Sequence, residues 1–183
     1  MTHDLDPGRL LRRELAGPEP PWSSGDKDAV EAFIHKAVEA IEAETNTSSR
    51  AVFDDYGSGY ASYVDAWFYR PTEDFRTGPD QYVGLVVLFS RLTNHFVVGE
   101  GAKHWNDSGS ASSYLPAIQI VDAIENEAVS TLASTAIRIL TGMGVRRLKR
   151  DDLNPLLPED TDVPTILTEG PFRLFDAVFY WED

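Results

Sequence analysis

Apolar residues recur at helical spacing in the segment that follows the first 25 residues. Within residues 26–44, Val30, Ile34, Val38 and Ile41 lie three or four positions apart, as on one face of a helix. Asp26 and Ser24 precede them, and the side chain of either can cap a helix N-terminus. The pattern therefore predicts an amphipathic helix at the start of the folded body.

After residue 50 the apolar period changes to two, which is the spacing of a half-buried strand. Four segments carry this period and predict four successive strands, at residues 51–56, 60–71, 81–92 and 94–100. Their links are short, so neighbouring strands are expected to pair antiparallel in a meander. The third segment, QYVGLVVLFSRL, is apolar at odd and even positions, which favours a central strand covered on both faces.

Helical spacing returns between Tyr114 and Thr141, where Pro116 fits a first helical turn and Gly142 fits a helix end. The last apolar stretch, residues 172–181, predicts a further strand. Strands thus follow one another and do not alternate with helices. We therefore predict an α+β fold with an antiparallel-rich meander sheet of four to six strands. An N-terminal amphipathic helix and one long helix after the fourth strand would flank this sheet.

The first 25 residues do not share these patterns. Pro7 can begin a short helix, and GPEPPW at residues 17–22 is a stiff connector. We expect an N-terminal arm at residues 1–25, which either docks on the body or frays from it. Residues 26–183 are expected to form a single α+β domain.

Charge narrows the classes of partner. Among 183 residues, 16 are Lys or Arg and 30 are Asp or Glu, which gives a net charge of −14. A field of this sign repels a phosphate backbone, so nucleic acid is disfavoured as a partner. The acidity either keeps the protein in solution or steers a basic partner. The run RRLKR at residues 146–150 is basic in an otherwise acidic chain. Its cations either complement the dipole at the end of a helix or contact an anion.

Other features limit the chemistry. Cysteine is absent, which excludes disulfides, thiolate zinc sites and cysteine nucleophiles and fits a cytoplasmic location. No apolar stretch approaches the roughly 20 residues of a membrane span, so no membrane contact is expected. A metal site would need His95 and His104 to converge with Glu100 or Asp107, but strand alternation sends His95 and Glu100 to opposite faces. No phosphate-loop or triad spacing occurs, and we expect neither a metal nor a cofactor.

Three further carboxylates could have either a catalytic or a purely structural role. Asp54 and Asp55 precede YGSG and are expected to form a turn, with acid catalysis as the alternative. Asp176 lies inside an apolar stretch, so we expect it to pair with a base such as Arg173 or Arg91.

Two sets of residues are candidates for binding a partner, because Trp and Tyr are enriched at binding hot spots. The first set shares one face of the second predicted strand, which is either exposed or buried in a sheet covered on both sides. It comprises Tyr63, Asp65, Trp67 and Tyr69. The second set lies in residues 99–114, which we expect to form a long mobile loop. It comprises Glu100, His104, Trp105 and Asp107, and Trp105 either anchors a partner or packs on the body.

In size, acidity and lack of a catalytic signature, the chain resembles the cytoplasmic immunity proteins that neutralise bacterial toxins. The resemblance implies an inhibitor that occludes a basic protein partner, and we favour this function over an enzyme. The alternative is a small-molecule-binding protein or hydrolase with a cleft between the sheet and the long helix, where Asp65, His95 or His104 would transfer protons. A closed pocket with converging His and Asp would favour that alternative, and a flat acidic patch with exposed aromatic residues would favour the inhibitor. A self-assembling protein that buries an apolar edge strand is a third possibility, and the sequence gives no oligomeric state.

Overall fold

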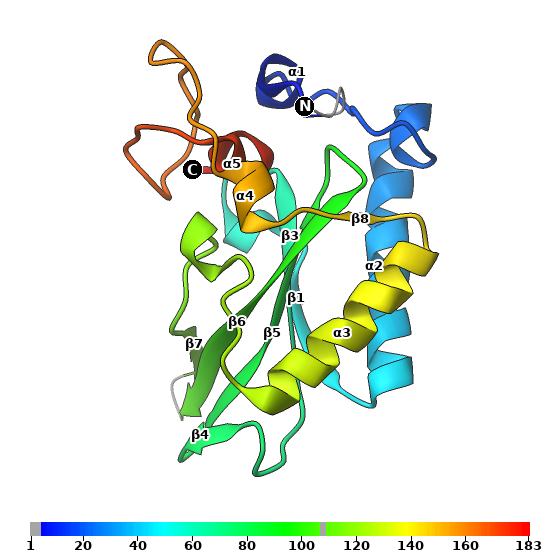
Figure 1. The fold of residues 1–183 in the computed structure, drawn as a ribbon, viewed down its shortest axis with the longest axis vertical. Coiled ribbons are helices and arrows are strands. Elements are labelled where there is room, and N and C mark those ends of the chain that lie inside the picture. Colours follow the sequence, from blue (N-terminus) through cyan, green and yellow to red (C-terminus); the bar gives the residue numbers. More distant parts are fainter. Residues whose placement is uncertain (1–4, 107–108) are drawn as a thin grey trace.

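A computed structural model describes residues 5–106 and 109–183. Within these ranges the chain forms five α-helices and a large, curled, mainly antiparallel sheet, so the predicted α+β class is confirmed (Figure 1). The helices are α1 (Pro7–Leu11), α2 (Lys27–Thr45), α3 (Glu127–Gly142), α4 (Arg150–Leu153) and α5 (Leu174–Val178). The strands are β1 (Ser48–Val52), β2 (Tyr60–Ala61), β3 (Tyr63–Tyr69), β4 (Arg76–Gly78), β5 (Gln81–Ser90), β6 (His95–Asn106), β7 (Gly109–Ser112), β8 (Arg146–Arg147) and β9 (Trp181–Glu182).

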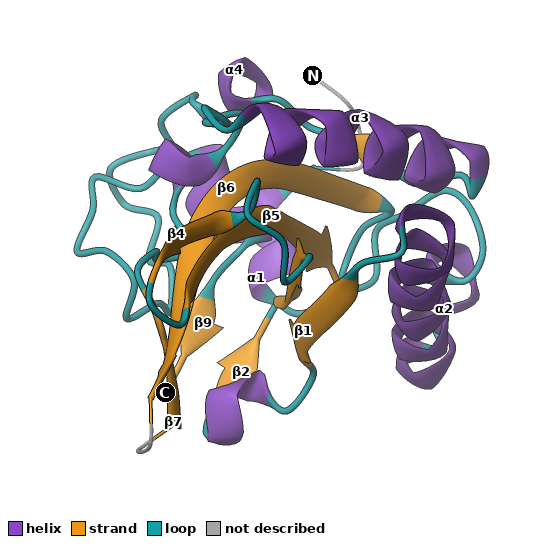
Figure 2. Cartoon of the chain, turned by 90° about the horizontal axis from the view of Figure 1, so that it is seen from below, coloured by secondary structure: helices purple, strands orange, loops and turns teal. Residues whose placement is uncertain are grey.

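The main sheet is an antiparallel meander with short additions. Its central path runs β1-β3-β5-β6-β7, and each neighbouring pair is antiparallel. Strand β4 also pairs with β5, and β8 pairs parallel to β6, so the sheet has seven strands where four to six were predicted. A separate two-stranded sheet joins β2 to β9 and thereby brings the C-terminus beside residue 60. Figure 2 shows how strongly the main sheet curls.

Strand β5 lies at the centre of the sheet and is covered on both faces, which confirms its predicted position. Leu85 and Val87 belong to one buried cluster, and Val86 and Leu88 belong to the other. This division follows from strand geometry, in which successive side chains point to opposite faces. The sheet consequently needs two covering layers and has two hydrophobic cores.

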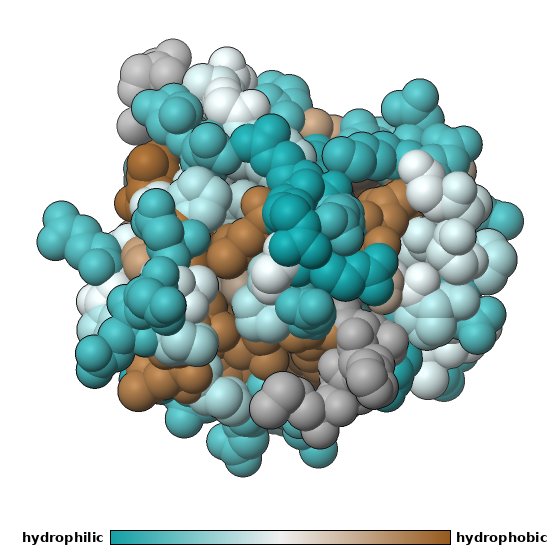
Figure 3. Space-filling view, turned by 90° about the horizontal axis from the view of Figure 1, so that it is seen from above, coloured by the Kyte–Doolittle hydropathy of each residue, from teal (hydrophilic) through white to brown (hydrophobic). Residues whose placement is uncertain are grey.

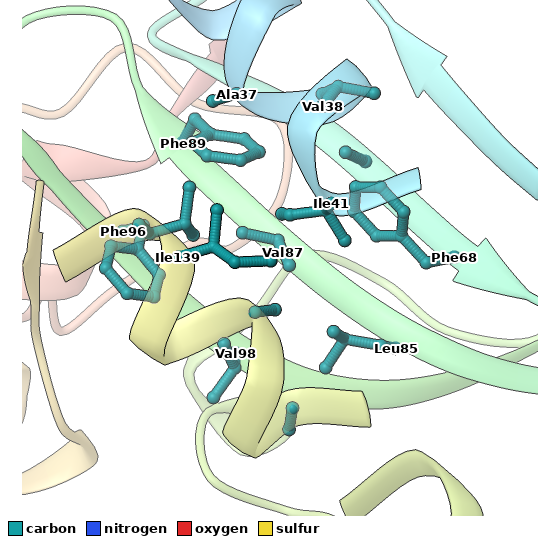
Figure 4. Close-up of a cluster of buried hydrophobic side chains, with 14 of the residues drawn as sticks. Ala37, Val38, Ile41, Phe68, Leu85, Val87, Phe89, Phe96, Val98 and Ile139 are labelled. Carbon is teal, nitrogen blue, oxygen red and sulfur yellow. The ribbon is translucent and has the colours of Figure 1, made fainter. Parts of the chain in front are cut away.

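The first core fills the space between the sheet and the helix pair α2 and α3. Figure 4 shows Ile41 of α2 and Ile139 of α3 directed towards Val87 of β5, with Phe89 and Phe96 beside them. Burial of each large aliphatic side chain contributes about 1.5–3 kcal/mol. These buried side chains lie between the sheet and α3, where the small-molecule alternative expected a cleft.

The second core covers the opposite face of the sheet and is built from the two ends of the chain. Helix α1 packs against α5, and Leu10 of α1 is buried together with Phe175 and Val178 of α5. The N–H of Ala16 donates to the Leu92 carbonyl at 2.8 Å. Trp22 enters the first core, where its ring meets Phe33 edge-on at 5.1 Å. Residues 5–25 therefore contribute to both cores.

The long helix predicted from Tyr114 to Thr141 was wrong in its first half, because α3 begins only at Glu127. The Asn126 side chain caps α3 by accepting from the Val129 N–H. Before it, the Asp122 N–H donates to the Val98 carbonyl at 2.8 Å, so the chain runs along β6. Gly99 permits this approach, since a Cβ there would lie 2.2 Å from the Ile120 carbonyl oxygen. The apolar residues between positions 118 and 124 have the spacing of a helix, but they pack against the sheet from a segment that is not α-helical.

The long mobile loop predicted at residues 99–114 was also wrong. Strand β6 continues to Asn106, and β7 pairs with it from Gly109 to Ser112. The small residues of β7, GSAS, carry little strand propensity, so this pairing depends on the neighbouring strand β6 and not on local preference.

The predicted C-terminal strand at residues 172–181 is replaced by α5 and the two-residue strand β9. The Asp176 carboxylate accepts from the Arg173 backbone N–H at 2.6 Å and closes the first turn of α5. Asp176 therefore contacts the backbone of Arg173, and burial raises the pKa of its carboxyl group. When odd and even positions of a short stretch are both apolar, its period does not tell a buried helix from a buried strand.

The first predicted strand ends earlier than expected. Strand β1 stops at Val52, and Asp55 and Tyr56 adopt positive φ in a turn, as expected of the acids before YGSG. The Arg91 guanidinium holds this turn by an ion pair with Asp55 and a 2.7 Å hydrogen bond to the Phe53 carbonyl.

Two glycines offer a matched test of the sheet packing. A Cβ on Gly84 in β5 would lie 2.6 Å from both the Phe68 carbonyl oxygen and the Trp67 ring, so Gly84→Ala should lower the free energy of unfolding by about 3 kcal/mol. Gly142 has nothing within 4 Å of the same position, and Gly142→Ala should raise stability by up to about 1 kcal/mol. Urea denaturation measures both values. A Gly84→Ala protein as stable as the wild type would contradict the close contact of β3 and β5.

Candidate functional site

The face of β3 that carries Tyr63, Asp65 and Trp67 lies beneath the second core. The three residues are 1%, 4% and 0% exposed, and Tyr69 at the strand end is partly buried. These three side chains therefore lie in a sheet that is covered on both faces, which was one of the two possibilities for them. Tyr63 and Trp67 cannot act as exposed anchors for a partner while the protein is folded.

Asp65 is a buried carboxylate that two phenols from distant parts of the chain hold in place. The Tyr56 hydroxyl donates to one carboxylate oxygen and the Tyr114 hydroxyl to the other, each at 3.0 Å. Burial raises the pKa of Asp65 because the charged form loses its hydration, and the nearby Lys103 charge opposes this shift. Burial also raises the pKa of both phenols, so both stay protonated and donate.

Lys103 reaches the same cluster from β6. Its ammonium group lies 5.8 Å from the centre of the Trp67 ring and 5.2 Å from that of Tyr114, and burial lowers its pKa. Trp67 in turn donates from Nε1 to the Gly101 carbonyl at 2.8 Å. The cluster contains an acid, a base and phenols, but its carboxylate is enclosed and its partners come from the fold itself. We interpret it as a structural clamp across β3 and β6.

Of the second predicted set, Glu100 is a structural residue. Its carboxylate accepts from the backbone N–H groups of Glu125 and Asn126, at 3.1 and 2.8 Å, just before α3. His104 lies on β6 and is partly buried. Trp105 lies on the same strand, but its side chain is outside the described part of the structure, as is the whole of Asp107. The described residues therefore do not join the two predicted sets into one surface.

His95 does not converge with Glu100, as the proposed metal site would require. His95 is buried and lies beside Arg146 of β8 in the parallel ladder, whereas Glu100 faces the start of α3. Across residues 5–106 and 109–183, no three His, Asp or Glu side chains gather as a metal ion would require.

The basic run at residues 146–150 is largely tied into the fold. Arg147 forms an ion pair with Asp122 at 2.7 Å, and Arg150 donates from Nε to the Val121 carbonyl at 2.9 Å. These contacts hold the segment before α3 against β8 and α4. These contacts explain the two arginines by a structural role, without an external anion.

A long irregular stretch near the C-terminus combines charge with exposed apolar side chains. Residues 154–172, which we call the acidic segment, connect α4 to α5 without a helix or strand of their own. They contain four acidic residues and no Lys or Arg. All four are exposed, and none forms an ion pair within the described structure. They are Glu159, Asp160, Asp162 and Glu169.

Exposed aliphatic side chains accompany these acids. Leu156 is 59% exposed and Ile166 is 56% exposed, and among the described residues only Leu115 is a comparably exposed large apolar side chain. The segment is nevertheless anchored, since the N–H groups of Leu157 and Ile166 donate to the backbone of residues 172 and 181. Figure 1 shows it projecting beyond α4 and α5. Irregular segments of this length are usually either functional or linkers, and the backbone anchors together with the exposed apolar side chains favour the first. The sequence signal was a run of acids and prolines without Lys or Arg.

No family model, curated protein or solved structure matches the chain, so its function must be inferred from its own geometry. None of the described helices has both the length and the apolar composition needed to cross a bilayer.

Replacement of Asp65 by Asn tests the effect of burying this carboxylate. Folding raises the pKa of Asp65 above its unfolded value, so the wild type loses stability as pH rises from the unfolded to the folded pKa. Asn cannot ionise and escapes that loss. The unfolding free energy of D65N relative to wild type should therefore increase in urea denaturation as the pH rises above about 4, the pKa of an aspartate in an unfolded chain. A difference that does not change with pH would show that burial does not shift this group.

Proposed function

We propose that the protein is a cytoplasmic protein-binding module that inhibits a basic partner by covering its surface, as bacterial immunity proteins do with toxins. The observation that carries the proposal is the acidic segment, where four exposed carboxylates lie beside exposed Leu156 and Ile166. No cation in the segment neutralises these charges. A basic surface would meet both opposite charge and apolar contact there.

The charges and the apolar side chains would act at different stages of binding. An exposed ion pair contributes only about 0–1 kcal/mol, so the carboxylates would mainly speed the encounter. Burial of Leu156 and Ile166 would stabilise the complex once formed, by roughly 25 cal/mol for each Å² of apolar surface removed from water. The same field repels acidic proteins and nucleic acid, which contributes to the choice of partner.

A small-molecule site is the second candidate, because a hollow of about 880 Å³ borders the acidic segment and has His95, Asp151 and Asp152 in its lining. The Asp152 carboxylate accepts from the Lys149 N–H at 2.8 Å and so belongs to the first turn of α4. The remaining walls are mainly leucine and proline, which suit an apolar group better than hydrolysis. The hollow therefore supports binding more than catalysis.

The proposal is tested by recovering the bound protein from the native host and measuring its association kinetics. A basic protein should be recovered. Neutralising the four acids of the acidic segment should lower its association rate constant about tenfold or more at low salt. Raising the salt from about 10 mM to about 150 mM shortens the Debye length from roughly 30 Å to roughly 8 Å and should remove most of this difference. The substitutions are Glu159→Gln, Asp160→Asn, Asp162→Asn and Glu169→Gln.

The matched control removes the same net charge at four exposed acids elsewhere on the chain. It should associate nearly as fast as the wild type if the acidic segment is the docking site. Equal slowing in both variants, association that ignores salt, or the absence of a basic partner would each contradict the proposal. The control substitutions are Glu19→Gln, Glu39→Gln, Asp54→Asn and Asp80→Asn.

A further inference from the structure

The hollow beside the acidic segment is enclosed by parts of the chain that lie far apart in sequence. It has a volume of about 880 Å³ and opens between α1, β8, α4 and residues 155–161. Figure 3 looks onto this end of the molecule and shows apolar surface between polar side chains. Six leucines contribute to its walls: Leu5, Leu11, Leu148, Leu156, Leu157 and Leu174.

We propose that this hollow receives the apolar anchor side chains of an amphipathic, positively charged segment of the basic partner. The inference rests on the proposed function and adds the place and chemistry of the main contact. In protein interfaces, a few side chains that fill a pocket provide most of the binding energy. The hollow is the feature of this face that can supply such a pocket.

Its size and its walls suit several side chains. Clefts of roughly 300–1,000 Å³ enclose ligands as large as a drug molecule, so the volume exceeds what one side chain needs. Pro7, Pro155 and Pro158 lie in the walls, and their fixed φ angles limit the backbone motion of the rim. A site already shaped before binding loses less conformational entropy when it is filled.

Charge complementarity favours a basic occupant. Asp151 of α4 is an exposed residue of the lining, and the exposed residues Glu159 and Asp160 directly follow Pro158, which also lines the hollow. The lining also contains two arginines: Arg147 is paired with Asp122, and Arg146 is an exposed cation on β8. The attraction for a basic segment therefore comes from the acids of α4 and from those that follow Pro158. A segment with leucine-like residues on one face and lysine or arginine on the other would place its cations near these acids.

Leu156 connects the hollow to the surface around it. It lines the hollow and is also one of the two exposed aliphatic side chains of the acidic segment. A small apolar molecule in the hollow would leave Ile166 and the four acids exposed. A protein segment lying across the opening would also reach Glu159 and Asp160, which directly follow the lining residue Pro158, and this is why we favour it as the occupant.

The inference can be tested with two probes in place of the unidentified partner. The neutral dye N-phenyl-1-naphthylamine fluoresces more strongly in apolar sites and should bind in the hollow. A peptide of about 14 leucine and lysine residues, long enough for a marginal helix, should displace it when the leucines share one helical face. A peptide of the same composition in an order that breaks this face should not displace the dye.

Two leucine substitutions locate the peptide. Leu156→Glu puts a carboxylate into the wall of the hollow, and Leu115→Glu makes the same change at a similarly exposed leucine outside it. Both added charges attract lysine, so a loss of affinity cannot come from charge. We expect Leu156→Glu to weaken peptide binding about tenfold or more and Leu115→Glu to change it less than about twofold.

The outcomes separate this inference from the proposed function. Displacement of the dye that Leu156→Glu abolishes and Leu115→Glu preserves would support the hollow as the anchor site. Absence of displacement, or equal binding by both variants, would overturn it. Peptide binding that depends only on the four acids would also overturn it, while the kinetics with the native partner would still support the proposed function.

Discussion

Burial of β5 on both faces is the constraint on which the rest of this structure depends. Its alternating residues, such as Val86 and Val87, enter two different cores, so a single layer of helices cannot cover it. Helices α2 and α3 cover one face, and α1, α5 and the segments around them cover the other. The two ends of the chain are thereby drawn into the fold, and the N-terminal residues from Leu5 onwards become part of its packing.

Covering both faces also decides where recognition can occur. The aromatic stripe of β3 resembles a binding surface in the sequence, but the second core encloses Tyr63 and Trp67. Asp65 is enclosed with them, and the hydroxyls of Tyr56 and Tyr114 compensate for its lost hydration. With the sheet covered, exposed charge and exposed apolar side chains come together on the connection between α4 and α5. That connection is where we place the function.

The sequence predicted the elements whose pattern is long and local. Helix α2 has a clear apolar stripe over 19 residues, and β5 is apolar at nearly every position, so both could be predicted. The segment before α3 could not, because its course along β6 depends on the missing side chain of Gly99. Helix α5 spans only five residues and depends on the contact of Asp176 with its own N-terminus, which periodicity does not reveal.

The candidate site was less predictable than the fold. The clamp at Asp65 joins Tyr56 and Tyr114, and Tyr114 is 49 positions away, so no local motif could indicate it. The acids of the acidic segment were visible in the sequence, together with the absence of Lys and Arg among them. What the sequence did not show was that Leu156 and Ile166 remain exposed beside those acids, since exposure depends on how α4 and α5 pack.

Backbone hydrogen exchange, measured by mass spectrometry on the protein alone and in complex with the basic partner that we propose, tests the proposed place of recognition most directly. In the free protein, β5 amides should exchange only through global unfolding, and amides of the acidic segment should exchange much faster. Binding should protect residues 154–172 and leave β3 unchanged. Protection gained in β3 or α2, with none in the acidic segment, would contradict the assignment of recognition to that segment.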